Sequence, residues 1–155
     1  MKILKAAGVA LVAILLVAQL FRIDKSNPPV ESEVIAPPQV KEIMRRSCYD
    51  CHSNEVAWPW YADVAPASWL VAHDVHEGRD ELNFSTWGTY SPARRQKKLK
   101  EIGKTIEEGE MPPWYYIYPM HREARLSPAD RDVLMAWVKS ESAALKQQAA
   151  QPPAR

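Results

Sequence analysis

The stretch Cys48-Tyr49-Asp50-Cys51-His52 holds the only two cysteines of this 155-residue chain. Two thiols three residues apart, followed at once by an imidazole, form the C-x-x-C-H pattern to which c-type haem is attached. On a helical turn the thiols can reach the two vinyl groups at one edge of the porphyrin, and the imidazole then lies beneath the iron, for which it is a good ligand. The pattern predicts one covalent haem c, held through Cys48 and Cys51, with His52 as the proximal iron ligand.

Two other kinds of site use paired cysteines. A thioredoxin-type C-x-x-C accompanies a βαβ pattern, which we do not find around residues 48–51. A structural zinc site needs four ligands, and a second ligand pair at the usual spacing is missing from this sequence. A disulfide framework for a small secreted domain needs more than two cysteines. Haem attachment is therefore the interpretation that we favour.

A second iron ligand is expected from Met111, in the sequence GEMPP at residues 109–113. This methionine follows a predicted helix end and begins a rigid proline segment. A thioether opposite histidine raises the reduction potential and suits electron transfer. The alternatives are an open coordination site or a second histidine, namely His73, His76 or His121.

The rest of the chain predicts an all-α domain of four helices joined by long loops. Helix starts are indicated by Pro37-Pro38, Pro66, Ser91-Pro92 and Ser127-Pro128, the last with Asp130 in a capping-box-like position. Gly78 and Gly109 are expected to end the second and third helices. Apolar stripes comprise Leu99, Ile102 and Ile106 in the third helix and Leu134, Trp137, Val138 and Leu145 in the fourth. The loop at 110–126 is long enough to suggest a functional role.

The N-terminal residues 3–21 are apolar apart from Lys5 and Gln19. Such a run predicts a single transmembrane helix, and the lack of an A-x-A-like site after it favours a retained anchor over a cleaved signal segment. We therefore divide the chain into an anchor or signal segment (1–23), an extended tether (24–36), a haem-binding domain (37–146) and a flexible tail (147–155). This division predicts a single-pass protein of the bacterial inner membrane with its haem domain in the periplasm.

Charge and aromatic content narrow the function further. The chain has 20 basic and 19 acidic residues, a balance that argues against nucleic-acid binding. Aromatic side chains are expected to line a haem pocket, from residues 58–61 and 114–115 and from Trp69 and Trp87. Arg79, Arg94 or Arg95 could pair with the haem propionates.

Four longer blocks resemble the bacterial haem-binding domain family of small cytochrome c-like proteins. They are WPWY at 58–61, SWLVAHDVHEGR at 68–79, LNFSTW at 82–87 and GEMPP at 109–113, and the resemblance covers residues 34–145. The N-terminal segment ending in QLFR also resembles that family. The resemblance implies a monohaem cytochrome c-like fold outside the cytoplasmic membrane, with haem at Cys48, Cys51 and His52. By similarity to cytochromes c, Met111 matches the loop that supplies the sixth ligand.

Two protein ligands on the iron predict a carrier of single electrons rather than an enzyme. Its expected partners are membrane or periplasmic redox proteins. The alternative is a haem enzyme or sensor, peroxidase-like or gas-binding, with an open distal site. A third hypothesis is a structural or haem-handling protein. The role of Met111 separates the first two, since a free iron site would favour the enzyme or sensor.

Overall fold

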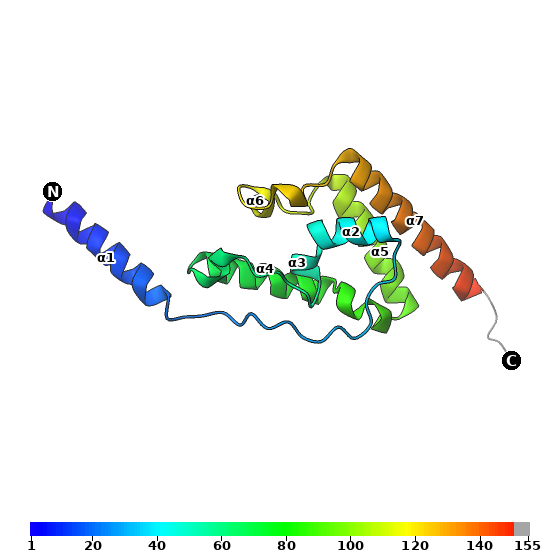
Figure 1. Cartoon of the computed structure of the whole chain (residues 1–155), viewed down its shortest axis with the longest axis horizontal. Coiled ribbons are helices and arrows are strands. Elements are labelled where there is room, and N and C mark those ends of the chain that lie inside the picture. The colour runs from blue at the N-terminus through cyan, green and yellow to red at the C-terminus, as the bar shows by residue number, and fades with distance from the viewer. Residues whose placement is uncertain (151–155) are drawn as a thin grey trace.

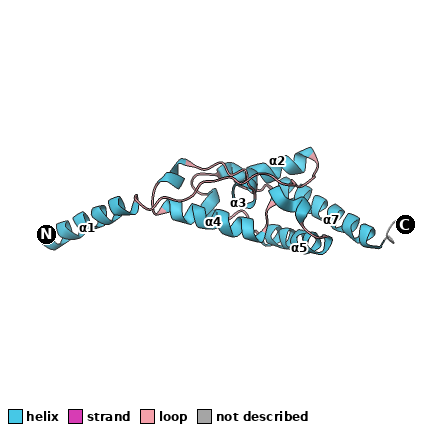
Figure 2. Ribbon diagram, turned by 90° about the horizontal axis from the view of Figure 1, so that it is seen from below, coloured by secondary structure: helices cyan, strands magenta, loops and turns pink. Residues whose placement is uncertain are grey.

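The computed structural model describes residues 1–150, and these residues form helices and loops without a strand (Figure 1, Figure 2). In chain order the helices are α1 (Lys2–Ala18), α2 (Pro38–Ser47), α3 (Tyr49–His52), α4 (Ala67–Glu81), α5 (Pro92–Glu108), α6 (Trp114–Ile117) and α7 (Pro128–Ala150). Short 3-10 helices lie in the loops, at η1 (Trp60–Asp63), η2 (Phe84–Thr89) and η3 (Arg122–Ala124). The all-α prediction is confirmed for this part of the chain.

The hydrophobic core lies mainly where α5 packs along α7 and α2 packs against α7, a unit that we call the core half (Figure 1). Leu99 of α5 and Leu134 of α7 are fully buried. The predicted stripe of α7 is buried throughout, whereas Ile102 in the stripe of α5 is only partly buried. Both stripes thus face the core as their helical periodicity predicted.

The ends of α5 and α7 follow the capping signals in the sequence. The Ser91 hydroxyl accepts a hydrogen bond from the Arg94 amide at 3.3 Å, and Gly109 ends α5 with a left-handed φ of 71°. At α7, the Ser127 hydroxyl accepts from the Asp130 amide at 3.1 Å, while Asp130 accepts from the Ser127 amide at 2.9 Å. These reciprocal bonds confirm the predicted capping box.

The first part of the predicted tail at 147–155 is helical, because α7 continues to Ala150. The remaining residues, 151–155, lie outside the described chain. The predicted loop at 110–126 also contains two short helical turns, α6 and η3.

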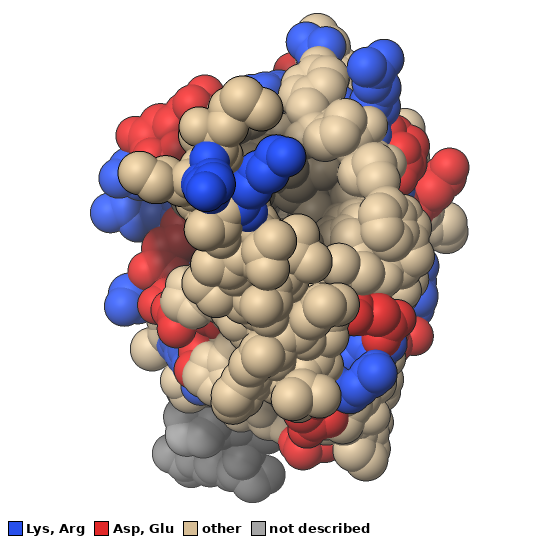
Figure 3. All heavy atoms as spheres, turned by 90° about the vertical axis from the view of Figure 1, so that its left-hand side faces the viewer, with Lys and Arg blue, Asp and Glu red and all other residues tan. Residues whose placement is uncertain are grey.

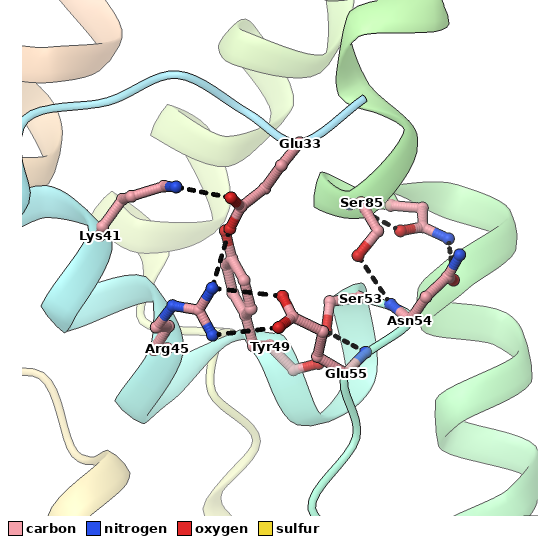
Figure 4. Close-up of polar contacts among 9 residues, drawn as sticks. Glu33, Lys41, Arg45, Tyr49, Ser53, Asn54, Glu55 and Ser85 are labelled. Atoms are coloured by element: carbon pink, nitrogen blue, oxygen red, sulfur yellow. Dashed lines mark hydrogen bonds and ion pairs between the residues drawn. The ribbon is translucent and has the colours of Figure 1, made fainter. Parts of the chain in front are cut away.

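Residues 24–36, which we predicted as an extended tether, lie along the domain and are called the strap below. The strap pairs with the segment around η2, where the Val34 amide donates to Phe84 O at 2.9 Å, and the Val34 side chain is buried. Next to it, Glu33 accepts from Lys41 at 2.6 Å, and from Arg45 and the Tyr49 hydroxyl at 3.0 Å each (Figure 4). The strap is therefore packed onto the domain, where it buries apolar surface and carries an ion-pair network.

The predicted transmembrane helix over residues 3–21 is not found. Helix α1 has 17 residues and ends at Ala18. Its end is fixed by Gln19, whose side chain donates to Leu15 O and Ala65 O and accepts from the Ala65 amide. Within residues 1–150, none of the helices is both long and apolar enough to cross a membrane. The apolar side chains of α1 are largely exposed, and the end of the molecule where α1 lies is mostly uncharged (Figure 3).

Candidate functional site

The C-x-x-C-H motif lies at a break between two helices. Helix α2 ends at Ser47, Cys48 leaves the helical conformation with φ −130° and ψ −36°, and α3 then forms one turn. In that turn the His52 amide donates to Cys48 O at 2.9 Å. The chain thus brings both thiols and the imidazole to one short segment, as the spacing of the motif predicted.

Both cysteines are free thiols, part-buried and not joined to each other. Burial is the main cause that raises the pKa of Cys48 and of Cys51 to about 12; the neighbouring charge of Asp74 adds to the shift for Cys51. A redox-active C-x-x-C lowers the pKa of its attacking thiol instead. In addition, residues 1–150 contain no group of three or more His, Cys, Asp or Glu side chains placed to hold a metal ion. The raised pKa values of the two thiols weigh against the thioredoxin-type interpretation.

The imidazole of His52 is oriented by helix α4 and the residue that follows it. Its Nδ1 lies 2.8 Å from Gly78 O and 3.1 Å from Leu82 O. A carbonyl oxygen can only accept, so Nδ1 carries the proton and Nε2 keeps its lone pair. Burial of the ring lowers the pKa of His52, although both carbonyl contacts oppose that shift. A neutral imidazole with a free Nε2 is the form that ligates iron.

Gly78 sets the distance between α3 and α4. A Cβ atom at this position would lie 2.5 Å from Cys51 O, far inside normal contact, so only glycine permits the observed approach. The predicted role of Gly78 as a helix end is wrong, because α4 continues to Glu81. The close approach is what places Gly78 O against His52.

A cavity of about 260 Å³ opens beside the motif. It brings together the four residues predicted as ligands or attachment points, Cys48, Cys51, His52 and Met111. The rest of its lining is Ser47, Asp50, Asp74, Glu77, Gly78, Glu81, Pro112, Pro113, Tyr115 and Tyr116. Met111 is 40% exposed, so it lies at the cavity wall rather than in the hydrophobic core.

The other three histidines do not line this cavity. His73 and His76 are exposed on α4, and His76 lies 3.4 Å from Asp80. His121 is engaged elsewhere, with its Nε2 2.7 Å from the Tyr61 hydroxyl. Of the candidates for a second ligand, Met111 is therefore the one that the fold brings to the motif.

The predicted arginine and aromatic partners are mostly placed elsewhere. Arg79 donates to Ser53 O, Arg95 to Tyr90 O, and Arg94 lies over the Tyr90 ring. Of the predicted aromatic residues, Tyr115 lines the cavity, whereas Trp87 is buried in the core and Trp60, Trp69 and Trp114 are exposed.

Sequence reasoning missed the acidic wall of the cavity, formed by Asp74, Glu77 and Glu81 of α4. Their spacing of three and four residues, shared with Gly78, places them on one helix face and could have revealed them. Burial raises the pKa of Asp74 above its ordinary value.

Comparison with known families identifies the kind of domain that contains this cavity. A family model described as the haem-binding domain matches residues 13–140. The chain belongs to the haem-binding domain family. This haem-binding domain includes the strap, in agreement with its packing against the domain. Neither the curated proteins nor the solved structures contain a match to the chain.

The residues around the cavity fit a haem by their chemistry. Two thiols, an imidazole with a free Nε2 and a thioether are suitable groups for attachment to a porphyrin and for iron ligation. The Ser47 hydroxyl, also in the lining, is buried without a hydrogen-bond partner among the described residues. Such a group is expected to find a partner when a ligand fills the site.

Proposed function

We propose that this haem-binding domain is a monohaem c-type cytochrome-like protein that carries single electrons. In this proposal Cys48 and Cys51 form thioether bonds to the haem, and His52 and Met111 ligate the iron. The observation that supports it best is the single cavity lined by all four residues, with the Nδ1 of His52 tied to Gly78 O. Bound haem would supply a one-electron redox couple, and a His/Met ligand pair raises its potential.

The protein side chains would have three tasks in this function. The thiols hold the cofactor in place, so it is not lost when its charge changes. The backbone carbonyls of Gly78 and Leu82 keep His52 in one tautomer and one orientation. Met111, which lines the cavity with Pro112 and Pro113, would supply a thioether ligand to the iron. We further propose that the domain acts in the periplasm with membrane or periplasmic redox proteins, since c-type haem is attached outside the cytoplasm.

A second candidate function is a gas-binding or peroxidase-like haem protein. It is favoured by the 40% exposure of Met111, which lies on a loop rather than within a long helix. If Met111 leaves the iron readily, small molecules can bind in its place.

The two functions are separated by one substitution in the full-length protein, produced in a host that matures c-type haem. Met111→Ala is compared with Met120→Ala, a control on the same loop with 46% exposure that does not line the cavity. If the protein is an electron carrier, the haem of wild type and of Met120→Ala should be low-spin, show the sulfur-to-iron absorption band and exclude carbon monoxide. Met111→Ala should lose the band, bind carbon monoxide and have a lower potential.

Two results would count against the electron-carrier function. If wild type binds carbon monoxide at once, the iron is open and the sensor or enzyme is favoured. If Met111→Ala matches wild type in spectrum and potential, Met111 is not a ligand.

A further inference from the structure

Residues 111–125 carry Met111 and are joined to the rest of the described chain by side chains. Their described backbone hydrogen bonds stay within the segment, such as Tyr118 N to Trp114 O at 2.9 Å and His121 N to Ile117 O at 3.0 Å. A loop without backbone ties to its surroundings keeps much of its conformational entropy unless side chains fix it. The position of Met111 therefore depends on the side-chain contacts of this loop.

Two short hydrogen bonds join the loop to the haem motif and to η1. The Tyr116 hydroxyl donates to Asp50 Oδ2 at 2.6 Å, and Asp50 lies between the two cysteines. The Tyr61 hydroxyl lies 2.7 Å from His121 Nε2. The rings of Tyr116 and His121 stack with their centroids 4.3 Å apart and an interplanar angle of 6°. The two hydrogen bonds therefore hold one stacked pair of side chains. We call Asp50, Tyr61, Tyr116 and His121 the latch.

The proton positions of the latch are mutually consistent. His121 Nδ1 lies 3.3 Å from the Glu123 carboxylate, which can only accept, so Nδ1 carries the proton. His121 Nε2 then accepts from the Tyr61 hydroxyl. On the other side, Asp50 Oδ1 accepts from the Ala57 amide at 3.1 Å. Burial and the bond to Asp50 raise the pKa of Tyr116 far above its ordinary value, so Tyr116 remains a donor at physiological pH.

We propose that Asp50, Tyr116 and His121 are positioning residues that hold Met111 at the cavity, through the contacts of Asp50 to Tyr116 and of His121 to Tyr61. The proposal rests on the proposed function, because it takes Met111 as the iron ligand. It gives Asp50, one of the two residues between the cysteines, a role in linking haem attachment to the distal ligand. Loss of the latch is expected to leave the thioether bonds intact and to loosen only the distal side.

The test compares Tyr116→Phe with Tyr118→Phe in the full-length, haem-matured protein. Both remove one hydroxyl from the same loop, but the Tyr118 hydroxyl makes only a long contact of 3.4 Å to Arg125, with the Tyr118 side chain exposed. Tyr116→Phe keeps the ring that stacks on His121 and removes a charge-assisted bond, which should raise the open fraction of the loop by about tenfold. We expect about tenfold faster hydrogen exchange in residues 113–118 and about tenfold higher carbon monoxide affinity.

Tyr61→Phe tests the second bond and is expected to give a smaller change in the same direction, because a neutral hydrogen bond is weaker. Unchanged hydrogen exchange and carbon monoxide affinity in Tyr116→Phe would overturn the proposal, as would equal changes in Tyr118→Phe. These outcomes are separable from those of Met111→Ala. If Met111→Ala opens the iron while Tyr116→Phe behaves as wild type, the latch is wrong and the ligand is right. If Met111→Ala has no effect on the iron, the ligand role and with it this proposal fail, even where hydrogen exchange shows that Tyr116 orders the loop.

Discussion

The core half and the cavity side of this molecule are held together by different means. In the core half, α5 and α7 meet through buried aliphatic and aromatic side chains such as Leu99, Leu134 and Trp137. On the cavity side, α3 and α4 approach through a glycine, and the loops are joined by polar contacts such as Tyr116 to Asp50. The difference indicates that the core half is stabilised mainly by apolar burial, whereas the cavity side depends more on close backbone approach and polar contacts.

The largest effect on stability is expected from a cavity in the core half. Leu134 is 1% exposed, and Leu134→Ala should lower the free energy of unfolding by about 2–5 kcal/mol. Leu70→Ala on the cavity side is the matched control, because Leu70 is 53% exposed and surface changes are usually within about 0.5 kcal/mol. Urea unfolding followed by circular dichroism measures both. Similar losses of unfolding free energy in the two variants would contradict the view that buried apolar side chains stabilise the core half.

An intermediate effect is expected where α3 and α4 meet. Gly78→Ala introduces a Cβ only 2.5 Å from Cys51 O, which should cost about 1–3 kcal/mol and shift the haem motif. Gly103→Ala in α5 meets its nearest atom, Val138 Cγ1, at 3.5 Å, an ordinary contact, so the higher helix propensity of alanine should make it neutral or stabilising.

The measurement for this pair is haem content per protein together with the unfolding midpoint. We expect a lower haem content only in Gly78→Ala. Full haem content in that variant would show that the close approach is not needed at the site.

A smaller, pH-dependent effect is expected in the strap. Burial opposes the ionisation of Glu33, but the bonds from Lys41 and Tyr49 outweigh it and hold the pKa of Glu33 below its ordinary value. The folded state therefore binds this proton less tightly than the unfolded state. The stabilisation is complete above the ordinary pKa and is lost as the pH falls through the lower, folded value.

Glu33→Gln should therefore cost about 1–2 kcal/mol at pH 7 and less at a lower pH, as Glu33 of the folded wild type becomes protonated. Glu31→Gln, an exposed position in the same strap, should have little effect at either pH. Urea unfolding at both pH values checks this expectation. A cost for Glu33→Gln that does not change with pH would exclude the ionised network as its cause.

What the sequence could predict depended on how local each signal is. The ends of α5 and α7 were predictable because Ser91, Gly109 and the Ser127–Asp130 pair act on their own helix. The C-x-x-C-H motif is local in the same sense, because its thiols and imidazole lie within residues 48–52. Gly78 was misassigned, since its partner, Cys51 O, lies 27 residues away in the chain and can be seen only after α3 and α4 pack.

The strap was misread for a related reason. Its prolines and charges resemble those of a free linker, yet Val34 and Glu33 find partners that are distant in sequence. Met111 and Tyr115 were predicted from their own surroundings, but Tyr116 and the acidic face of α4 became visible only when the fold formed the cavity.

The most direct test of the account is the mass of the full-length, haem-matured protein after denaturation. The account predicts that one haem stays bound to the unfolded chain, on the peptide that contains Cys48 and Cys51, and that Cys51→Ala weakens or prevents that attachment. Release of all haem from denatured wild-type protein would contradict covalent attachment and, with it, the proposed c-type site.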